Sequence, residues 1–203
     1  MIGAAVVVWY FGWKRYRAVA LKNEQLPYGW LRIGDNYKVG VDHEIRHRGN
    51  VSGHIRYVGG ATRRIINSLS SQDNEADFGV LVQRFKADDY RGKTIRMSAY
   101  VRTHEADEAG LWMRIDGVRP RIRFDNMAGR PIRGTTAWQR HEITFDVPQE
   151  SVMIFFGALL VGTGEMWVDT FEFEIVAGEP LREAANFAGK DISMRPMDLD
   201  FEQ

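Results

Sequence analysis

Two histidines four residues apart, His43 and His47, form the motif HEIRH, whose residue types and spacing could do metal chemistry. On a helix this spacing puts both imidazoles on one face, where they bind zinc while the glutamate between them acts as a general base. Gly40 and Gly49 flank the motif, strand-like patterns surround it, and no long apolar helical face accompanies it. We therefore expect a solvated loop or strand edge here and predict no metal site.

Acidic side chains also come in groups, namely Asp88 with Asp89 and Glu105 with Asp107 and Glu108. A catalytic general acid needs a carboxyl whose pKa is raised by removal from water. Both groups fall where turns are expected, and turn carboxylates are normally solvated. The chain also lacks a nucleophile elbow and a glycine-rich phosphate loop. We predict no catalytic residue, no cofactor and no enzymatic activity.

The densest group of aromatic and polar side chains lies between residues 112 and 130. Strand alternation puts Trp112 with Arg114, and likewise Arg121 with Arg123, opposite the apolar side of their strands. Three interpretations stay open: an outward polar face with Asp–Arg pairs, a protein contact, and a glycan site built on an aromatic platform. The predicted partner- or ligand-binding residues are Trp112, Arg114, Arg121, Arg123, Asp125, Asn126 and Arg130.

The elements that must position these residues alternate with a period of two from Trp30 onward. In KTIRMSAYVRT the apolar residues share one face, while Arg96, Ser98, Tyr100 and Arg102 share the other. GLWMRIDG, WQRHEITFDV and EMWVDTFEFEIV alternate in the same way, and shorter candidates are NYKVGVD, VSGHIRYV, TRRIIN and DFGVLVQRFK. SVMIFFGALLV is apolar on both faces, which indicates a central strand covered on both sides or one that contacts a partner. About nine or ten short strands separated by turn signals predict an all-β protein, an antiparallel β-sandwich.

The first 26 residues have a different pattern. Ile2 to Trp13 is an apolar run broken only by two glycines, and three cations follow it within residues 14–17. A 12-residue helix spans roughly 18 Å, short of a bilayer core of about 30 Å, whereas a helix that continues to Leu21 is about 31 Å long. A signal peptide has its cations before the apolar core, not after it, and a buried helix of the folded domain is a further alternative.

We favour a membrane-anchor helix over residues 1–26, either spanning the bilayer or lying at its interface. Its aromatic belt and basic flank place the folded domain on the cytoplasmic side by the positive-inside rule. Residues 27–176 are predicted to form the sandwich, and residues 177–203 an irregular C-terminal arm with a short helix at Leu181–Phe187. The predicted anchor residues are Val6, Val7, Val8, Trp9, Tyr10, Phe11, Trp13, Lys14, Arg15 and Arg17.

Composition excludes several classes of protein. A hydrophobic fraction of 44% with 27% charged residues is that of a folded chain, and the absence of Cys excludes disulfides and Cys-based metal sites. The formal net charge of zero argues against a nucleic-acid partner. Residues 1–64 nevertheless contain 11 Lys or Arg against four Asp or Glu, so this part is expected to face anionic lipid or an acidic protein.

The order of four segments resembles a known module. ADDYRGKTIRMSAYVRT, AGLWMRIDG, FDNMAGRPIRGTTAWQRHEITFDVP and FFGALLVGTGEMWVDTFEFEIV are similar to bacterial jelly-roll domains of the carbohydrate-binding-module kind, over about residues 77–176. Such domains occur as accessories beside hydrolases and regulators. The resemblance implies a jelly-roll sandwich and a structural calcium site at Asp169, although Thr170 stands where the family pattern has a second Asp.

These observations lead to a functional hypothesis with two alternatives. We predict a non-catalytic, membrane-anchored accessory subunit that binds neighbouring proteins of a larger membrane complex, such as a respiratory or photosynthetic assembly. The first alternative is a membrane-anchored carbohydrate-binding module, whose partner is a glycan, and the second is a part of a hydrolase or regulator. A glycan binder should face outside, whereas the basic flank places this domain inside.

Overall fold

The structure, a computed structural model, describes residues 26–59, 77–178 and 192–202. Within these residues the chain forms nine strands and a single turn of 3-10 helix at Asp88–Tyr90, with no α-helix, so the predicted all-β class is confirmed. The strands are β1 (Leu31–Ile33), β2 (Tyr37–Asp42), β3 (Ser52–Tyr57), β4 (Phe78–Lys86), β5 (Thr94–Asp116), β6 (Arg123–Asp125), β7 (Ile132–Asp146), β8 (Met153–Val161) and β9 (Glu165–Ala177).

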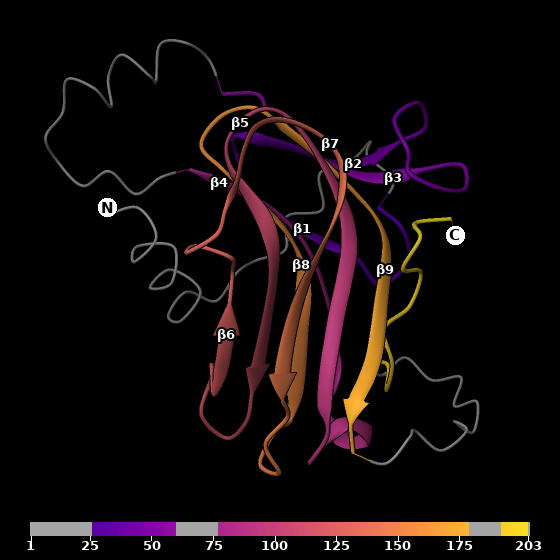
Figure 1. The fold of residues 1–203 in the computed structure, drawn as a ribbon, viewed down its shortest axis with the longest axis vertical. Helices are drawn as coiled ribbons and strands as arrows, with labels where there is room; N and C mark the ends of the chain where they lie inside the picture. The colour runs from indigo at the N-terminus through magenta and orange to yellow at the C-terminus, as the bar shows by residue number, and fades with distance from the viewer. Residues whose placement is uncertain (1–25, 60–76, 179–191, 203) are drawn as a thin grey trace, which may run out of the picture.

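All nine strands belong to one antiparallel hydrogen-bonded system in which β5 is the shared member. Its first half, residues 94–104, pairs with β7 and β9, and β9 continues to β3 and β2. Its second half, residues 108–116, pairs with β8 and β6, and β8 continues to β4 and β1. The first layer consists of residues 94–104 of β5 with β7, β9, β3 and β2. The second layer consists of residues 108–116 of β5 with β6, β8, β4 and β1. Figure 1 shows the long strands running along the longest axis of the molecule.

The continuity of β5 corrects a prediction. Two strands separated by an acidic turn at residues 105–108 were expected, but one strand runs through that segment. The chain bends there without ending, because Glu105 adopts a φ of 48° and the pairing with β7 slips at three places. Bulges of this kind bend a strand while it keeps its partners. Gly164 of the β8–β9 turn, with a φ of 101°, lies so close to the Glu105 carbonyl that any side chain would collide with it.

The main hydrophobic core lies between the two layers and receives alternate residues of every long strand. Phe156 of β8 meets Phe171 and Phe173 of β9 edge to face, and Phe85 of β4 meets Phe173, with ring centroids 4.8 to 5.6 Å apart. Burying a phenylalanine stabilises a protein by about 1.5–3 kcal/mol, and each such ring pair adds about 0.5–1.5 kcal/mol. Because the rings come from both layers, this cluster holds the sandwich together.

A smaller apolar cluster occupies the opposite face of the second layer. Its buried members are Val80 and Val82 of β4, Trp112 of β5 and Leu159 of β8. Strand β8 lies between β4 and β5, with the main core on one side and this cluster on the other. The prediction that SVMIFFGALLV is a central strand is confirmed, and its two apolar faces have a structural reason.

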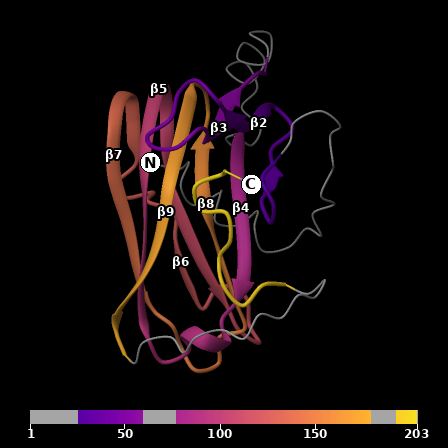
Figure 2. The ribbon, with the colours of Figure 1, turned by 90° about the vertical axis from the view of Figure 1, so that its right-hand side faces the viewer.

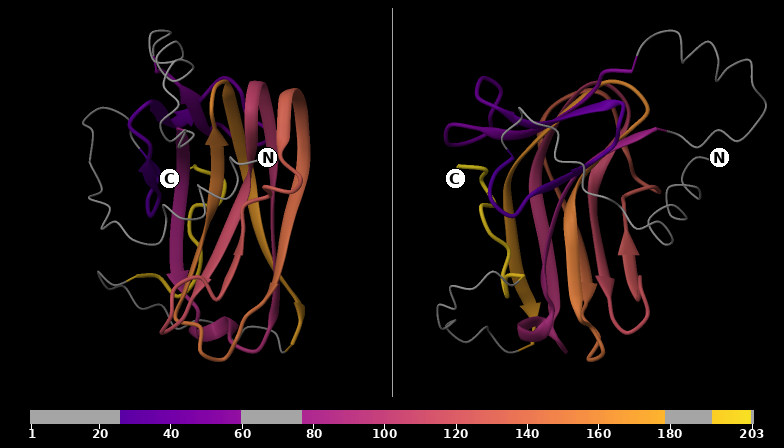
Figure 3. Two further views of the ribbon diagram at one scale, coloured as in Figure 1. Left: turned by 90° about the vertical axis from the view of Figure 1, so that its left-hand side faces the viewer. Right: turned by 180° about the vertical axis from the view of Figure 1, so that it is seen from behind.

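The C-terminal residues 192–202 have no regular secondary structure, yet they pack between the strands of the two layers (Figures 2 and 3). Gln83 of β4 exchanges hydrogen bonds of 2.7 and 2.8 Å with the backbone of Met197. The carbonyl of Leu199 accepts a hydrogen bond of 3.0 Å from the amide of Phe171 on β9. The segment therefore joins β4 of the second layer to β9 of the first.

Several predictions fall outside the described residues. These are residues 1–25 of the anchor predicted over residues 1–26, the strand TRRIIN and the helix at Leu181–Phe187. In the parts of the chain that the structure describes, no helix has the length and apolar character needed to cross a membrane.

Replacing Phe201 by alanine should lower the free energy of unfolding by about 3–5 kcal/mol, the usual cost of emptying a buried phenylalanine site. The ring is 3% exposed and lies 4.8 Å from Trp30 and 6.2 Å from Phe171. Urea denaturation measures the change. Val118→Ala, at a side chain that is 93% exposed, should alter stability by less than about 0.5 kcal/mol. Equal midpoints for the two variants would mean that the C-terminal segment is not part of the core.

Candidate functional site

The outer face of the first layer brings aromatic and charged side chains together. Tyr100 and Arg102 of β5 point to this face, because the residues on either side of each point into the core. Trp138 of β7, Trp167 of β9 and His54 of β3 join them there. Arg102, Trp167 and His54 are directly opposite one another on three adjacent strands, so they form one transverse row. We call these five residues the aromatic face.

The indole of Trp167 contacts a ring, a cation and a carboxylate. The His54 ring stacks on it with centroids 5.0 Å apart and an interplanar angle of 7°. The guanidinium of Arg102 lies 5.9 Å from the indole centroid. The Nε1 of Trp167 donates a hydrogen bond of 2.8 Å to Asp42 Oδ2. These contacts fix both the position and the tilt of the indole.

Two pKa values are shifted around this indole. Burial lowers the pKa of the His54 imidazole below its ordinary value, against the opposing effect of a 3.2 Å contact with Glu165. Burial would raise the pKa of Asp42, but hydrogen bonds from Trp167 Nε1 and from two backbone amides outweigh it, so that pKa is lowered. At neutral pH the aromatic face therefore presents a neutral stacked imidazole and an ionised carboxylate that orients the indole.

The β2–β3 loop, residues 43–51, folds over part of the aromatic face. The His47 ring stacks on Tyr100 with centroids 3.7 Å apart at 16°, and lies 5.7 Å from the Trp138 ring. Asp169 of β9 fixes the loop backbone, since its Oδ2 accepts hydrogen bonds of 2.8 and 3.0 Å from the amides of His47 and Arg48. One ring face of Tyr100 is therefore covered by a side chain of the protein itself.

The donors around Asp169 do not fit the calcium site that the resemblance implies. Besides the two loop amides on Oδ2, Thr170 donates to Oδ1 from its amide at 2.6 Å and from its hydroxyl at 3.3 Å. An ionised carboxylate has about four lone-pair positions, and four donors already point at this one. Among the described residues, no group of three or more His, Cys, Asp or Glu is arranged to hold a metal ion. Asp169 thus ties a loop to β9.

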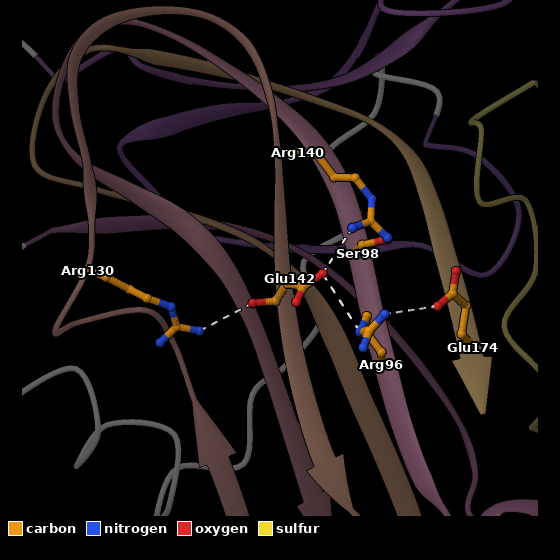
Figure 4. A network of polar contacts seen from close by, with 6 residues as sticks. All are labelled: Arg96, Ser98, Arg130, Arg140, Glu142 and Glu174. Atoms are coloured by element: carbon orange, nitrogen blue, oxygen red, sulfur yellow. Dashed lines mark hydrogen bonds and ion pairs between the residues drawn. The ribbon is translucent and has the colours of Figure 1, made fainter. Parts of the chain in front are cut away.

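A network of charged side chains borders the aromatic face on β5, β7 and β9 (Figure 4). Arg96 pairs with Glu174 at 3.4 Å and with Glu142 at 3.8 Å. Arg140 pairs with Glu142 at 2.9 Å and donates to Ser98 at 2.9 Å. These side chains are a third to a half exposed, so each pair contributes less than about 1 kcal/mol to stability. Their main effect is to place oriented donors and acceptors beside the aromatic rings.

Trp112 and Arg114, predicted as part of a binding surface, lie on the outer face of the second layer. Trp112 is only 2% exposed, because β4 and β8 present apolar side chains beside it, so its ring is not an open platform. Arg114 pairs with Asp116 at 3.0 Å and covers the ring of Phe155 at 4.3 Å. The alternation that put both residues opposite the main core is confirmed, but the indole that was expected to contact ligand is buried.

The other five predicted residues lie at β6 and the turns around it. Asp125 and Arg130 form an ion pair at 2.8 Å, the contact expected of an outward polar face. Asn126 closes a local turn by accepting an amide hydrogen bond from two residues further along. Arg123 is exposed on β6, and Arg121 precedes it at a bend with a φ of 55°. A binding role for these residues stays a prediction.

The HEIRH motif lies in the β2–β3 loop, as predicted, and has no helical turn. Its two histidines therefore lack the helical geometry of a zinc pair. His43 is exposed, whereas His47 is the residue stacked on Tyr100.

Sequence reasoning did not identify the aromatic face, although part of its signal was present. Alternation in WQRHEITFDV puts Trp138 opposite core residues, on the side of Arg140 and Glu142. Alternation through EMWVDTFEFEIV puts Trp167 on the side of Phe171, and the irregularity at Thr170, whose φ is 53°, turns Trp167 to the outer face instead. What alternation alone does not provide is the neighbouring strand. The aromatic face is built from β3, β5, β7 and β9 together with the β2–β3 loop. Strands β5, β7 and β9 are all far along the chain from that loop and from β3.

Comparison with known proteins finds one curated relative of significant similarity and many similar folds. No family model matches the chain. The uncharacterized HTH-type transcriptional regulator YbfP of Bacillus subtilis is 35% identical over 180 residues, which is 86% of this chain. The chain spans 57% of the length of that relative.

The similar solved structures share the fold at low sequence identity. The CBM22-1 xylan-binding domain of Paenibacillus barcinonensis Xyn10C is 14% identical, with a TM-score of 0.51, over 77% of this chain and 92% of that domain. The CBM22-1–GH10 modules of Clostridium thermocellum xylanase 10B, complexed with xylohexaose, are 12% identical, with a TM-score of 0.50, over 75% of this chain and 27% of that one. The enzymatically active domain of tailspike protein 4 from bacteriophage CBA120 is 10% identical, with a TM-score of 0.50, over 73% of this chain and 20% of that one. The sandwich expected from the resemblance to carbohydrate-binding modules is confirmed as a fold.

Replacing Asp169 by alanine should lower the free energy of unfolding by about 3 kcal/mol, because two loop amides and two Thr170 donors lose a buried ionised acceptor. Glu172→Ala, at an exposed carboxylate on the same strand, should change stability by less than about 0.5 kcal/mol. Urea denaturation measures both. A chelator should leave the melting temperature of the unaltered protein unchanged, and a drop on chelation would show that Asp169 binds metal after all.

Proposed function

We propose that this chain is a non-catalytic module that binds an oligosaccharide across the aromatic face. The observation that carries the proposal is the position of the half-buried Tyr100 and Trp138 on one outer sheet face, beside Trp167, whose indole is itself only 5% exposed. Sugar rings have apolar C–H faces that stack on aromatic side chains, and hydroxyls at their edges that hydrogen-bond to polar ones. The Arg–Glu pairs of Figure 4 supply such groups beside the rings.

The ligand class is supported by two of the similar folds. One is a xylan-binding domain, and the other belongs to modules complexed with xylohexaose. The likeness lies in the fold, so the proposal for this chain depends on the chemistry of its own aromatic face. A β-1,4-linked xylose oligomer is the first ligand to test.

The curated relative supports a context for this binding. Because that protein is named as a helix-turn-helix regulator, we propose that sugar recognition by this chain serves the control of transcription. The described residues form a β-sandwich similar to a xylan-binding domain, so we assign ligand recognition to this part of the chain.

Replacing Tyr100 or Trp138 by alanine should lower the affinity for xylohexaose at least tenfold, about 1.4 kcal/mol, because each variant removes a stacking surface. Isothermal titration calorimetry measures the affinity.

The matched control is Arg123→Ala, an exposed residue on the second layer, which should bind as the unaltered protein does. If Arg123→Ala loses affinity while Trp138→Ala keeps it, the residues predicted between 112 and 130 form the site. If the unaltered protein binds neither xylohexaose nor any of a panel of soluble polysaccharides, the glycan proposal is wrong.

A second proposal concerns residues 1–26, which we infer to attach the module to a membrane beside the proteins of a larger complex. Its support is the apolar run Ile2–Trp13 followed by cations at residues 14–17. The names of the relatives above mention no membrane complex, so this proposal is supported by the sequence alone.

Deleting residues 1–25 should move the protein from the membrane fraction to the soluble fraction without changing its melting temperature. The reason is that the cores described above consist of residues from Leu26 onward. Fractionation by centrifugation, followed by thermal unfolding, tests both parts. Recovery of the full-length chain in the soluble fraction would refute the anchor.

A further inference from the structure

The β2–β3 loop, residues 43–51, connects the aromatic face to the C-terminal segment, residues 192–202. At one place His47 covers Tyr100. At another, Glu202 accepts hydrogen bonds from three donors of the same loop. Its Oε1 accepts from the amides of Asn50 and Val51, and its Oε2 accepts from Asn50 Nδ2 at 2.8 Å. The loop is thus attached both to the proposed binding surface and to the C-terminal segment.

The C-terminal segment is itself fixed at its next residues. Phe201 is buried against the core, and the indole nitrogen of Trp30 donates a hydrogen bond of 3.0 Å to the carbonyl of Asp198. The Glu202 carboxylate fits closely against Gly49, whose φ is 61°, and any side chain there would collide with it. A well-anchored segment therefore holds the far end of the loop.

The position of the His47 ring is set by the loop more than by hydrogen bonds of its own. Its Nδ1 is buried and has no hydrogen-bond partner among the described residues. The backbone around it has two separate attachments, to Asp169 at the amides of residues 47 and 48 and to Glu202 at residues 50 and 51. Hydrogen bonds from Asn50 lower the pKa of Glu202, so the attachment is ionised at neutral pH.

We propose that residues 198–202 are a latch that holds His47 over Tyr100, so that the aromatic face opens to a sugar ring only when the loop is released. The ligand in this proposal rests on the proposed function, whereas the latch rests on the contacts alone. The coupling between the two is reciprocal. If the latch lowers the affinity for a ligand that needs the open loop, binding of that ligand weakens the Glu202 attachment by the same factor. Occupancy of the aromatic face is thereby transmitted to the C-terminal segment.

The latch is tested without ligand by amide hydrogen exchange, followed by NMR, in Glu202→Ala. Faster exchange at Asn50 and Val51 follows directly from the lost acceptor. The decisive amides are those of His47 and Arg48, which bind Asp169 and not Glu202, and they should exchange at least threefold faster if the loop moves as one unit. Unchanged exchange at these two amides overturns the latch.

The matched control is Glu150→Ala, an exposed carboxylate between β7 and β8 that lies outside the loop's attachments. It should leave all four amides as they are in the unaltered protein. Faster exchange of the loop in this control would mean that the loop responds to any lost surface charge, and the latch would be rejected.

The ligand arm uses xylohexaose and titration calorimetry. Glu202→Ala and His47→Ala should each bind about three- to tenfold more tightly than the unaltered protein, because the first releases the loop and the second removes the covering ring. Equal affinities in the presence of faster loop exchange would show that the loop does not gate the face. If no variant binds xylohexaose or the polysaccharide panel, the sugar proposal fails, and exchange at residues 47 and 48 alone decides the latch.

Discussion

A single strand of 23 residues, β5, hydrogen-bonds with four others and belongs to both layers of the sandwich. Its bend at Glu105 turns one hydrogen-bonded system into two facing layers, so that alternate residues on each side of the bend point into the same core. A break at this point would leave two short strands whose polar backbone groups need new partners inside the protein. The bend, with Gly164 packed against it, is therefore the constraint on which both the core and the outer faces depend.

In the candidate site, the buried carboxylate of Asp169 is the constraint that positions the β2–β3 loop. Asp169 has no exposed surface, and burial of an ionised group is tolerated only where donors surround it. Here the donors are the amides of a loop that leaves β2 and the backbone and hydroxyl of Thr170. The cost of burying the charge is offset when the loop lies over the face, so Asp169 favours the placement of residues 47 and 48 there, and Glu202 holds residues 50 and 51 of the same loop.

The charge distribution on the first layer suits a neutral ligand. Arg96 and Arg140 are each paired with Glu142, and Arg96 pairs also with Glu174, so the field of the cations is largely cancelled by adjacent carboxylates. A phosphate or other strong anion is best bound by unpaired guanidinium groups, whereas sugar hydroxyls need both donors and acceptors in fixed positions. These paired charges, beside the half-buried Tyr100 and Trp138, support the proposal of a sugar ligand.

Much of the fold could be predicted from the sequence, because the side-chain period of a strand is a local property. Alternation along KTIRMSAYVRT assigns Tyr100 to the polar side, and the two apolar faces of SVMIFFGALLV identify a central strand before any partner is known. The same reasoning placed Trp112 correctly opposite the core but took its face for an open surface, because burial on that face is decided by neighbouring strands.

Only the tertiary structure could decide which polar faces meet. Trp167 hydrogen-bonds to Asp42 from 125 residues away, and His47 reaches Tyr100 from a loop whose own sequence, HEIRH, resembles a metal motif. The sequence by itself determined the class of the fold, the inward and outward sides of each regular stretch of strand and the absence of Cys chemistry, whereas the irregularities at Glu105 and Thr170 came from the tertiary structure. The order of strands and the path of the β2–β3 loop were decided by non-local hydrogen bonds, since strand pairing depends on backbone groups that every residue carries and that no side-chain pattern specifies.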